Sequence, residues 1–511
     1  MNEYLKLRAG TPDDDNRNYL PPELYHTDIV VNEGGNNSQP YPERLQEFNE
    51  ELIPGIPGNW FEYVPSTYDG SKKVPLVVSL HGGMMNGWAQ CIYTSWSYVA
   101  EREGFIVVYP TGTTPKHPVN HFWTMEPVPG SPFNELGDID GVPTPKALPI
   151  DENPDIKFIF AVIEKMKEKY NIDADRIFMQ GMSNGCGMTM QIARSFDHVL
   201  AGAAFSAGGG RIARYIDENN QLQDKGGPKS VWISHPELNG MGPSIEYEAE
   251  GVRQDRYYWL LVNGCTELPK ITIDGEHNMA FFTGEKAAVV FDDIKNRDHG
   301  QTLDEAFLYW DYLFAGTRRA GDVIEQKEAI LPRSGDEFAA AFAEGISRVW
   351  WKNEVHELTT APVKWQKWKY HGLQGGVKVR GEYLCVPVRF LAEMAGGEFR
   401  EDADTLASEI VLPDGKVVRF ARGSILCEIG DTMRSMYCEA LHRNGELLVP
   451  VEWFAKYILK LQVSVCNGVV YVTDHMADLS YCMADLLKDI LTDRLYREDY
   501  LAKIKAENIH W

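Results

Sequence analysis

A serine stands between two glycines in the segment GMSNG, at residues 181–185. The residues before it, RIFMQ, have the apolar character of a strand, and those after it, CGMTMQIARSF, have helical spacing. In a G-x-S-x-G turn between a strand and a helix, the glycines permit the tight bend and the hydroxyl is held above the sheet. The alternative is a Gly-rich turn without chemistry. The context favours Ser183 as a nucleophile.

Such a nucleophile needs hydrogen-bond donors for the oxyanion that forms when it attacks a carbonyl. The sequence HGG at residues 81–83 directly follows the apolar run VPLVVSL. In this architecture one donor is the N–H of the residue after the serine and another comes from the loop after an early strand. We therefore expect donors at Asn184 and Gly83, with Met84 as the alternative to Gly83. His81 precedes the nucleophile and is predicted to be structural.

The general base should follow the nucleophile and the acid along the chain. His299 is the best placed histidine, because it follows the apolar run AAVVFDDI in a polar loop and precedes a helical segment that begins at Thr302. His198 and His277 are interpreted as solvated residues, and His235 as a support for the acid loop. The spacing therefore predicts that His299 is the base.

The acid that orients this base should lie in the loop after the strand SVWISH, where the sequence HPELNG is found. Glu237 is predicted to be that acid. Asn239 stands close by, at a position where an aspartate would be expected. Asp292 and Asp293, on the strand before the base, are the alternatives.

The elements that must position these groups follow an alternating pattern. Continuous apolar runs, typical of strands buried on both faces, are separated by segments of helical periodicity. This pattern predicts an α/β fold of the α/β-hydrolase type, with a mostly parallel sheet and helices on both faces. The strand-like runs lie at residues 60–65, 74–80, 105–110, 176–180, 202–206, 230–235 and 286–294, and helical segments lie at 88–103, 155–171, 184–196 and 302–316.

A chain of 511 residues is expected to form more than one domain. We predict a loop-rich lead-in at 1–57, a catalytic domain at 58–320, a helical linker at 321–371, an α+β module at 372–480 and a helical tail at 481–511. The module contains a weak repeat, in which GEYLCVPVRFLAEM at 381–394 matches GELLVPVEWFAKYI at 445–458.

The composition narrows the range of partners. The net charge of −24 argues against binding to nucleic acid or an anionic membrane. No apolar run is long enough to span a bilayer, and the N-terminal residues contain no apolar signal segment. The eight cysteines include no CxxC pair and are expected to be mostly buried free thiols.

With these motifs in order, residues 58–318 resemble the polyhydroxybutyrate depolymerase-like esterases, a family that overlaps with feruloyl and acetylxylan esterases. The resemblance rests on VPLVVSLHGG, AEREGFIVVYPTG, FMQGMSNG, AGAAFSAGG and DHGQTLDEAFLYWDYLF. It implies an α/β-hydrolase fold, a triad at Ser183, Glu237 and His299, and export from the cell. Two departures are visible: HPELN lacks the glycine and aspartate that the family has there, and HGQT replaces a Trp-Pro pair after the base.

Residues 372–476 resemble the copper amine oxidase N-terminal-like module through VPVRFLAEMAGGEF and VPVEWFAKY. These positions contain no histidine cluster suited to copper, so no metal is predicted there. The module is expected to serve attachment, spacing or substrate contact.

A Pro-rich insert, which includes KHPVNHFWTMEPVPGSPF at 116–133, follows the third strand-like run. Ligands bind at this edge of open α/β sheets, so Trp123 and Phe122 are predicted to line an aromatic or sugar-binding cleft, with Met84 as a further substrate contact. A rigid loop that packs its own aromatic residues is the alternative. His117 and His121 are separated by Pro118, which argues against a helix that could present both to a metal.

These observations together predict a serine carboxylic-ester hydrolase that works through an acyl-enzyme and needs no cofactor. A small-molecule or polymer-linked ester is the expected substrate. A peptidase or acyltransferase of the same fold is one alternative. A non-catalytic binding protein with a degenerate hydrolase domain is the other.

Overall fold

The computed structural model describes residues 30–31, 37–38, 42–113, 119–128, 131, 134–139, 141–208, 210–301, 303–371, 376–402, 404 and 406–507. The chain divides into two units. The first contains the described residues up to Lys270, those in Glu276–Ser334 and those from Tyr496 onward. The second contains Ile271–Gly275 and the described residues of Gly335–Leu495.

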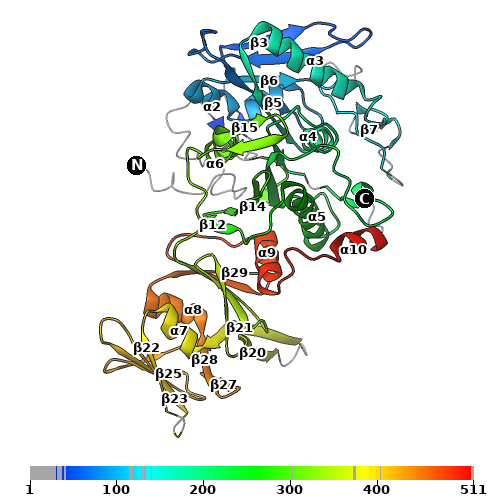
Figure 1. Ribbon diagram of the computed structural model, residues 1–511. Coiled ribbons are helices and arrows are strands. Elements are labelled where there is room, and N and C mark those ends of the chain that lie inside the picture. The colour runs from blue at the N-terminus through cyan, green and yellow to red at the C-terminus, as the bar shows by residue number, and fades with distance from the viewer. Residues whose placement is uncertain are drawn as a thin grey trace. The chain divides into compact units, whose positions relative to one another are not determined.

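A large mixed sheet forms the centre of the first unit (Figure 1). In spatial order its strands include β13 (His277–Phe282), β14 (Val289–Asp298), β11 (Ser230–Leu238), β10 (Gly202–Ser206), β9 (Ile172–Met182), β5 (Val74–Leu80), β6 (Ile106–Pro110), β4 (Asn59–Tyr63) and β3 (Leu45–Asn49). The strands from β14 to β6 run parallel to their neighbours, whereas β13, β4 and β3 pair antiparallel. The sheet is therefore mostly parallel, as the alternating pattern predicts.

Helices cover both faces of this sheet (Figure 1). On one side lie α2 (Trp96–Glu103) and α6 (Glu305–Tyr312), and on the other lie α3 (Pro154–Lys169), α4 (Asn184–Ser195) and α5 (Ile245–Asn263). The helix α3 shows why the sequence folds this way: Ile156, Ile159, Ile163 and Met166 share one face and are almost completely buried. The predicted α/β architecture, a mostly parallel sheet with helices on both faces, is confirmed for this unit.

The remaining elements of the first unit are short. The segment predicted as one helix before Gly104 forms α1 (Gly87–Tyr93) and α2, and Gly104 ends α2 at a φ of 79°. The lead-in is not all loop, since β3 belongs to the large sheet. Other elements are β1 (Val30–Val31), β2 (Asn37–Ser38), β7 (Gly137–Ile139), β8 (Val142–Thr144), β15 (Thr317–Ala320), β16 (Val323–Gln326) and α10 (Tyr500–Glu507).

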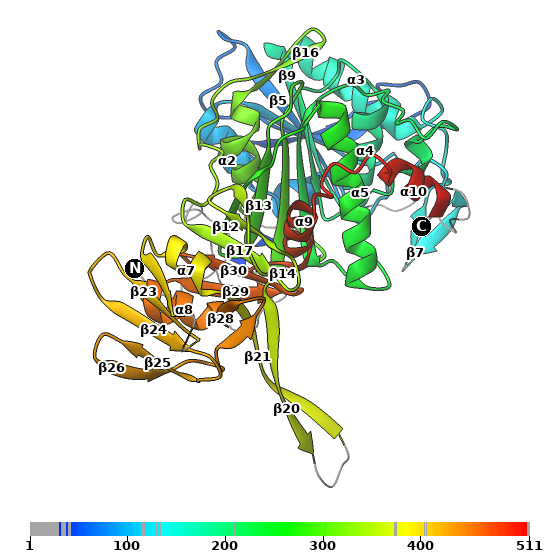
Figure 2. The same cartoon turned by 60° about the horizontal axis from the view of Figure 1, so that its bottom comes forward.

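The second unit is built mainly of antiparallel strands in three sheets. One sheet contains β19 (Glu354–Glu357), β18 (Arg348–Trp351), β17 (Ala339–Ala343), β30 (Val469–Thr473) and β29 (Gln462–Cys466). The next contains β20 (Val363–His371), β21 (Gly376–Pro387), β28 (Glu446–Pro450) and β27 (Leu441–Arg443). The last contains β22 (Glu398–Asp402), β23 (Ala407–Val411), β24 (Val417–Ala421), β25 (Leu426–Ile429) and β26 (Thr432–Ser435). Figure 2 shows β20 and β21 as a long hairpin that extends beyond the other strands of this unit.

The two copies of the weak repeat lie against one another in this unit. Each copy is a strand that passes through a proline into a short helix: β21 leads into α7 (Val388–Met394), and β28 leads into α8 (Val451–Phe454). The two strands pair antiparallel, with Val386 opposite Val449. The resemblance of residues 372–476 to a copper amine oxidase N-terminal-like module stays a prediction.

The predicted helical linker at 321–371 is wrong. The Ala-rich segment that suggested a helix is the strand β17, which pairs with β18 and β30 and is buried along its whole length. Pairing on both edges outweighs the helical propensity of alanine in this setting. The boundary also moves, because the second unit begins its main segment at Gly335 and includes α9 (Tyr481–Leu491), a helix predicted for the tail. None of the helices in the described ranges has the length and apolar character needed to cross a membrane.

Candidate active site

Ser183 lies at a sharp turn between β9 and α4. Its backbone has a φ of 53° and a ψ of −115°, a conformation that residues with a Cβ rarely adopt. Its N–H donates to the carbonyl of Ser206 at 2.9 Å, which fixes the turn against the next strand. A Cβ on Gly181 would lie 2.1 Å from the carbonyl oxygen of Gly185, so the motif's first glycine is required by close backbone approach.

Three side chains form a continuous hydrogen-bonded row at this turn. The hydroxyl of Ser183 lies 2.8 Å from Nε2 of His299, and Nδ1 of His299 lies 2.7 Å from Oδ1 of Asn239. Because an amide oxygen only accepts, Nδ1 carries the proton and Nε2 is left as the acceptor for the serine hydroxyl. This is the arrangement of a nucleophile, a base and an orienting group, with an amide in the third position.

The pairing of two strands explains why Asn239 and His299 meet. Leu238 at the end of β11 is paired with Asp298 at the end of β14. Asn239 follows β11 and His299 follows β14, so both residues leave the sheet at the same edge. The signal that could have identified Asn239 is this register, in which Asn239 and His299 each follow one of two paired strand ends.

The structure does not place Glu237 beside His299. Between the pairs Pro236–Ile294 and Leu238–Asp298, the strand β14 has additional residues that form a bulge opposite Glu237. The Glu237 carboxylate accepts from Nζ of Lys295 at 2.9 Å and from the N–H of Asn296 at 3.2 Å. Asn296 has a φ of 59°, so this carboxylate stabilises an unusual turn instead of orienting His299.

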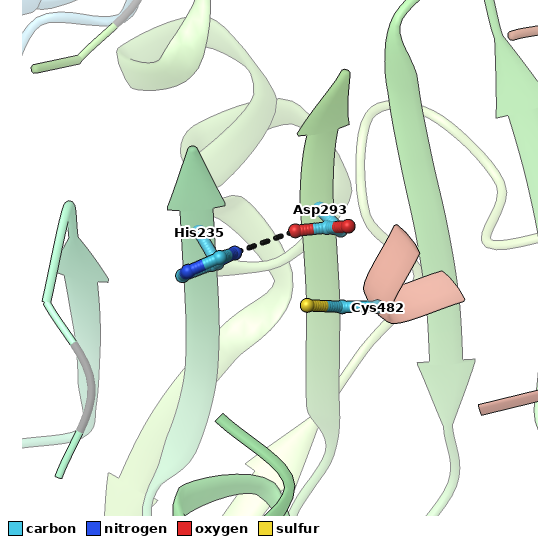
Figure 3. A group of neighbouring side chains, drawn as sticks. All are labelled: His235, Asp293 and Cys482. Atoms are coloured by element: carbon cyan, nitrogen blue, oxygen red, sulfur yellow. Dashed lines mark hydrogen bonds and ion pairs between the residues drawn. The ribbon is translucent and has the colours of Figure 1, made fainter. Parts of the chain in front are cut away.

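The two alternative acids are also held by other histidines. Asp293 lies 2.6 Å from Nδ1 of His235, and Figure 3 shows the imidazole of His235 directed at that carboxylate. Asp292 lies 2.9 Å from Nδ1 of His277, whose Nε2 lies 3.0 Å from Asp304. The interpretation of His277 as solvated is wrong, since only 8% of the residue is exposed.

The two acids around His277 also set its charge. Burial alone lowers the pKa of His277, but the carboxylates of Asp304 and Asp292 raise that pKa well above its usual value. His277 is therefore expected to be an imidazolium that joins β13, β14 and the start of α6. The solvated reading of His198 agrees with a side chain that is 56% exposed.

The HGG loop lies beside Ser183. A Cβ on Gly82 would be 3.6 Å from the Cβ of Ser183, and a Cβ on Gly83 would be 2.4 Å from the ring of Phe122. Asn184 is the first residue of α4, so its N–H has no carbonyl one turn earlier in the helix to accept it. The N–H of Met84 donates to the carbonyl of His121 at 2.9 Å, which favours Gly83 over Met84 as an oxyanion donor.

His81 is a structural residue of this loop. Its ring is fully buried, with Nδ1 2.6 Å from the carbonyl of Gly82 and Nε2 accepting from the N–H of Gly112 at 3.0 Å. Nδ1 therefore carries the ring proton and Nε2 carries none, so the imidazole is neutral. Burial, together with His121, lowers the pKa of His81 to about 3 against a raising effect of Gly82.

This neutral histidine should make the stability of the protein depend on pH. The unfolded chain binds a proton near the ordinary histidine pKa of about 6.5, whereas folded His81 does not until pH about 3. The contribution is therefore complete above about 6.5 and falls with decreasing pH, by about 1.4 kcal/mol per unit. The glutamine variant His81→Gln does not titrate, so its urea midpoint should fall less steeply than that of the wild type between pH 6.5 and 5. Parallel curves would contradict this assignment.

The prediction that Trp123 lines a substrate cleft is not supported. Its side chain is 1% exposed, its Nε1 donates to the carbonyl of His81 at 2.8 Å, and its ring stacks on that of His81 at 4.5 Å. The N–H of Trp123 also donates to Oδ1 of Asn184 at 2.6 Å. Trp123 therefore connects the HGG loop to the first residue of α4. A substrate contact at Met84 stays a prediction, and His117 lies outside the described residues.

The environment of His299 suits a base at neutral pH. Burial lowers the pKa of His299, and nearby Arg297 acts in the same direction, while Asp298 and Glu248 oppose them. The net result is a pKa below the ordinary value, so the ring is neutral and can accept a proton at pH 7.

Parts of the chain are similar in sequence to curated esterases. It is 32% identical over 155 residues to poly(3-hydroxyalkanoate) depolymerase C of Paucimonas lemoignei, covering 30% of this chain and 32% of that protein. It is 29% identical over 146 residues to the bifunctional acetylxylan esterase/xylanase XynS20E of Neocallimastix patriciarum, covering 29% and 17%. It is 23% identical over 260 residues to feruloyl esterase B of Piromyces equi, covering 49% and 43%.

The matched stretch spans less than half of the length of each of these relatives. No family model matches the chain. Among solved structures, an acetyl xylan esterase from Aspergillus awamori is 17% identical and has a TM-score of 0.37, with 53% of this chain and 98% of that chain covered. The curated relatives that match the chain are thus esterases, and the similarity extends over at most half of its residues.

Proposed function

We propose that the first unit is a serine carboxylic-ester hydrolase that works through an acyl-enzyme. The single observation that carries this proposal is the 2.8 Å contact between Oγ of Ser183 and Nε2 of His299, at a strained turn between a strand and a helix. The partial similarity to esterases supports the same reaction class.

The proposed reaction uses these groups in order. His299 accepts the hydroxyl proton of Ser183 at Nε2 as the oxygen attacks the ester carbonyl. The N–H groups of Asn184 and Gly83 stabilise the oxyanion. Collapse of the tetrahedral intermediate breaks the bond to the alcohol, which leaves with the proton from His299. Water, activated by the same ring, then releases the acid and restores the serine.

The relatives' names suggest esters of a carboxylic acid with a polymer or within one: acetylated xylan, feruloyl esters and polyhydroxyalkanoates. Rates of hydrolysis of p-nitrophenyl acetate, methyl ferulate and a hydroxyalkanoate oligomer would test this proposal. Hydrolysis of at least one, together with labelling of Ser183 by a fluorophosphonate, is the expected result. Labelling at another residue would contradict the assignment of the nucleophile.

One observation favours a second candidate, a non-catalytic binding protein. The group that faces Nδ1 of His299 is the neutral amide of Asn239, and an aspartate is the usual residue in a serine triad. A protein of this kind would react with none of the esters and would leave the fluorophosphonate intact. The same labelling experiment therefore separates the two candidates.

A further inference from the structure

Two cysteines of the second unit bring their sulfur atoms together inside the protein. Sγ of Cys385 lies 3.6 Å from Sγ of Cys438, and both residues are 0% exposed. Both carry free thiols in this structure. With Leu448 they form a small hydrophobic cluster, and its partly buried neighbours include Trp365 and Tyr383. The sequence pattern gave no sign of this pair, because 53 positions separate the two cysteines.

Hydrogen-bonded backbone fixes the position of each sulfur. Cys385 lies on β21, where it is paired with Val363 of β20 on one side and with Pro450 of β28 on the other. It therefore belongs to the interior of a sheet and has little freedom to move away from its partner.

The segment that carries Cys438 is held on both sides of that residue. The N–H of Met436 donates to the carbonyl of Ile425 at 2.8 Å. The N–H of Ala440 donates to the carbonyl of Ser424 at 2.9 Å. The contact between the two sulfurs is therefore built into the fold of the unit.

A pair of aromatic rings repeats this contact one step along the two segments. Tyr383 stands two residues before Cys385, and Tyr437 stands directly before Cys438. The centroids of the two tyrosine rings lie 5.0 Å apart, and the rings are stacked. The two segments are thus aligned over more than one residue.

A disulfide bond needs only a small movement from this arrangement. Its sulfur atoms are about 2.0 Å apart, so Sγ of Cys385 and Sγ of Cys438 must approach by about 1.6 Å. Rotation about the Cα–Cβ bonds supplies movements of this size. The hydrogen bond with Cys438, together with burial, raises the pKa of the Cys385 thiol far above its usual value. Because the thiolate is the attacking species, exchange has to occur while the unit is still folding.

We propose that Cys385 and Cys438 form a disulfide bond, through exchange with a low-molecular-weight disulfide while the second unit folds, and that this bond stabilises the unit. One cysteine thiolate attacks a sulfur of the small disulfide and releases a small thiol. The other cysteine, as a thiolate, then attacks its partner in the mixed disulfide and releases the second small thiol. The two cysteines together lose two electrons and two protons, and the small disulfide gains them.

The bond closes a loop that contains a whole sheet. Between the two cysteines lie α7 and the strands β22 to β26. A crosslink across a long loop restricts the unfolded chain, and so favours the folded unit. This inference goes beyond the proposed esterase activity and does not depend on it, because both cysteines lie in the second unit.

The first experiment identifies the bond by peptide mapping. The wild-type protein is unfolded in urea with a reductant, refolded in a buffer of reduced and oxidised glutathione, and alkylated with iodoacetamide in urea. Mass spectrometry should find a crosslinked pair of peptides that contain Cys385 and Cys438, with a mass about 2 Da below the sum of the two. The pair should disappear on reduction. Complete alkylation of both cysteines, or a bond to another cysteine, would overturn the proposal.

Cys427 provides the matched control, because it is also buried in the second unit but belongs to a different hydrophobic cluster. Cys427→Ala should retain the crosslinked peptides, whereas Cys385→Ala and Cys438→Ala should each lose them. A crosslink that disappears in Cys427→Ala would contradict the assignment. The wild-type map needs no variant, so the test holds even if an alanine variant fails to fold.

The second experiment measures the stabilisation. Urea unfolding of the crosslinked and the reduced wild type is followed by hydrogen exchange in peptides from β23 and β24, inside the closed loop. The crosslinked protein should have a urea midpoint higher by about 1 M. Equal midpoints would overturn the stabilising role. Neither experiment uses an ester, so a failure of the proposed function leaves both results unchanged.

Discussion

An alanine at position 183 is expected to reduce kcat for p-nitrophenyl acetate by about 10³- to 10⁶-fold. The reason is direct: Oγ of Ser183 is the atom 2.8 Å from the base, and alanine leaves no nucleophile at the turn. The fold should survive, because alanine has the same Cβ at the same backbone angles. The measurement is the initial rate, with the urea midpoint confirming that the variant is folded.

Two further variants sharpen this result. His299→Gln should lose a similar factor, and the double variant should be no slower than the worse single variant, because the two residues act as one unit. Ser71→Ala, at an exposed serine in the same unit, serves as the control and should keep wild-type rates. Losses that multiply in the double variant would show that the two residues do not share one step.

The variant Gly185→Ala should destabilise the first unit by about 3 kcal/mol and also reduce kcat. A Cβ at this position would lie 2.4 Å from two backbone oxygens, those of Leu80 and His81. Neither oxygen can move without displacing β5 or the HGG loop, so α4 must shift at its first turn. That shift displaces the N–H of Asn184, which is proposed to bind the oxyanion.

Gly251 provides the matched control for this prediction. It lies within α5, and a Cβ there would meet no atom within 4 Å. Gly251→Ala should therefore stabilise the protein by about 0.5–1 kcal/mol, through the better helix propensity of alanine. Urea unfolding of both variants measures the difference. A Gly185→Ala variant as stable as Gly251→Ala would show that the contact with β5 is not as tight as described.

Local pattern was enough to predict the large sheet and to select Ser183 and His299, whose side chains the structure brings together. Apolar runs identify β5, β6, β9 and β14, and the glycines around Ser183 reflect a backbone contact that any such turn must make. His299 could be identified because a polar loop follows a buried strand. These features are short-range, and a single sequence carries them.

The orienting group could not be predicted in the same way, since it depends on the register between two strands distant in sequence. The bulge in β14 opposite Glu237 is what turns that carboxylate toward Lys295 and allows Asn239 to reach His299. The prediction of a helix at the residues of β17 was wrong for a related reason. Alanines favour a helix when isolated, and only pairing with β18 and β30 makes this segment a strand. Trp123 shows the same limit, because its burial depends on the fold of the HGG loop.

The backbone of Ser183 has a consequence for the choice between enzyme and binding protein. A non-glycine residue in such a conformation costs about 1–3 kcal/mol, and glycine would adopt it without a steric clash. A unit that only bound ligands would gain stability from glycine there and would lose nothing. At position 183, glycine would give the more stable fold and serine provides the reactive hydroxyl. The chain has serine there. The neutral amide of Asn239 has no comparable cost in stability. The strained backbone of Ser183 is therefore the stronger of the two observations, and it favours an enzyme over a binding protein.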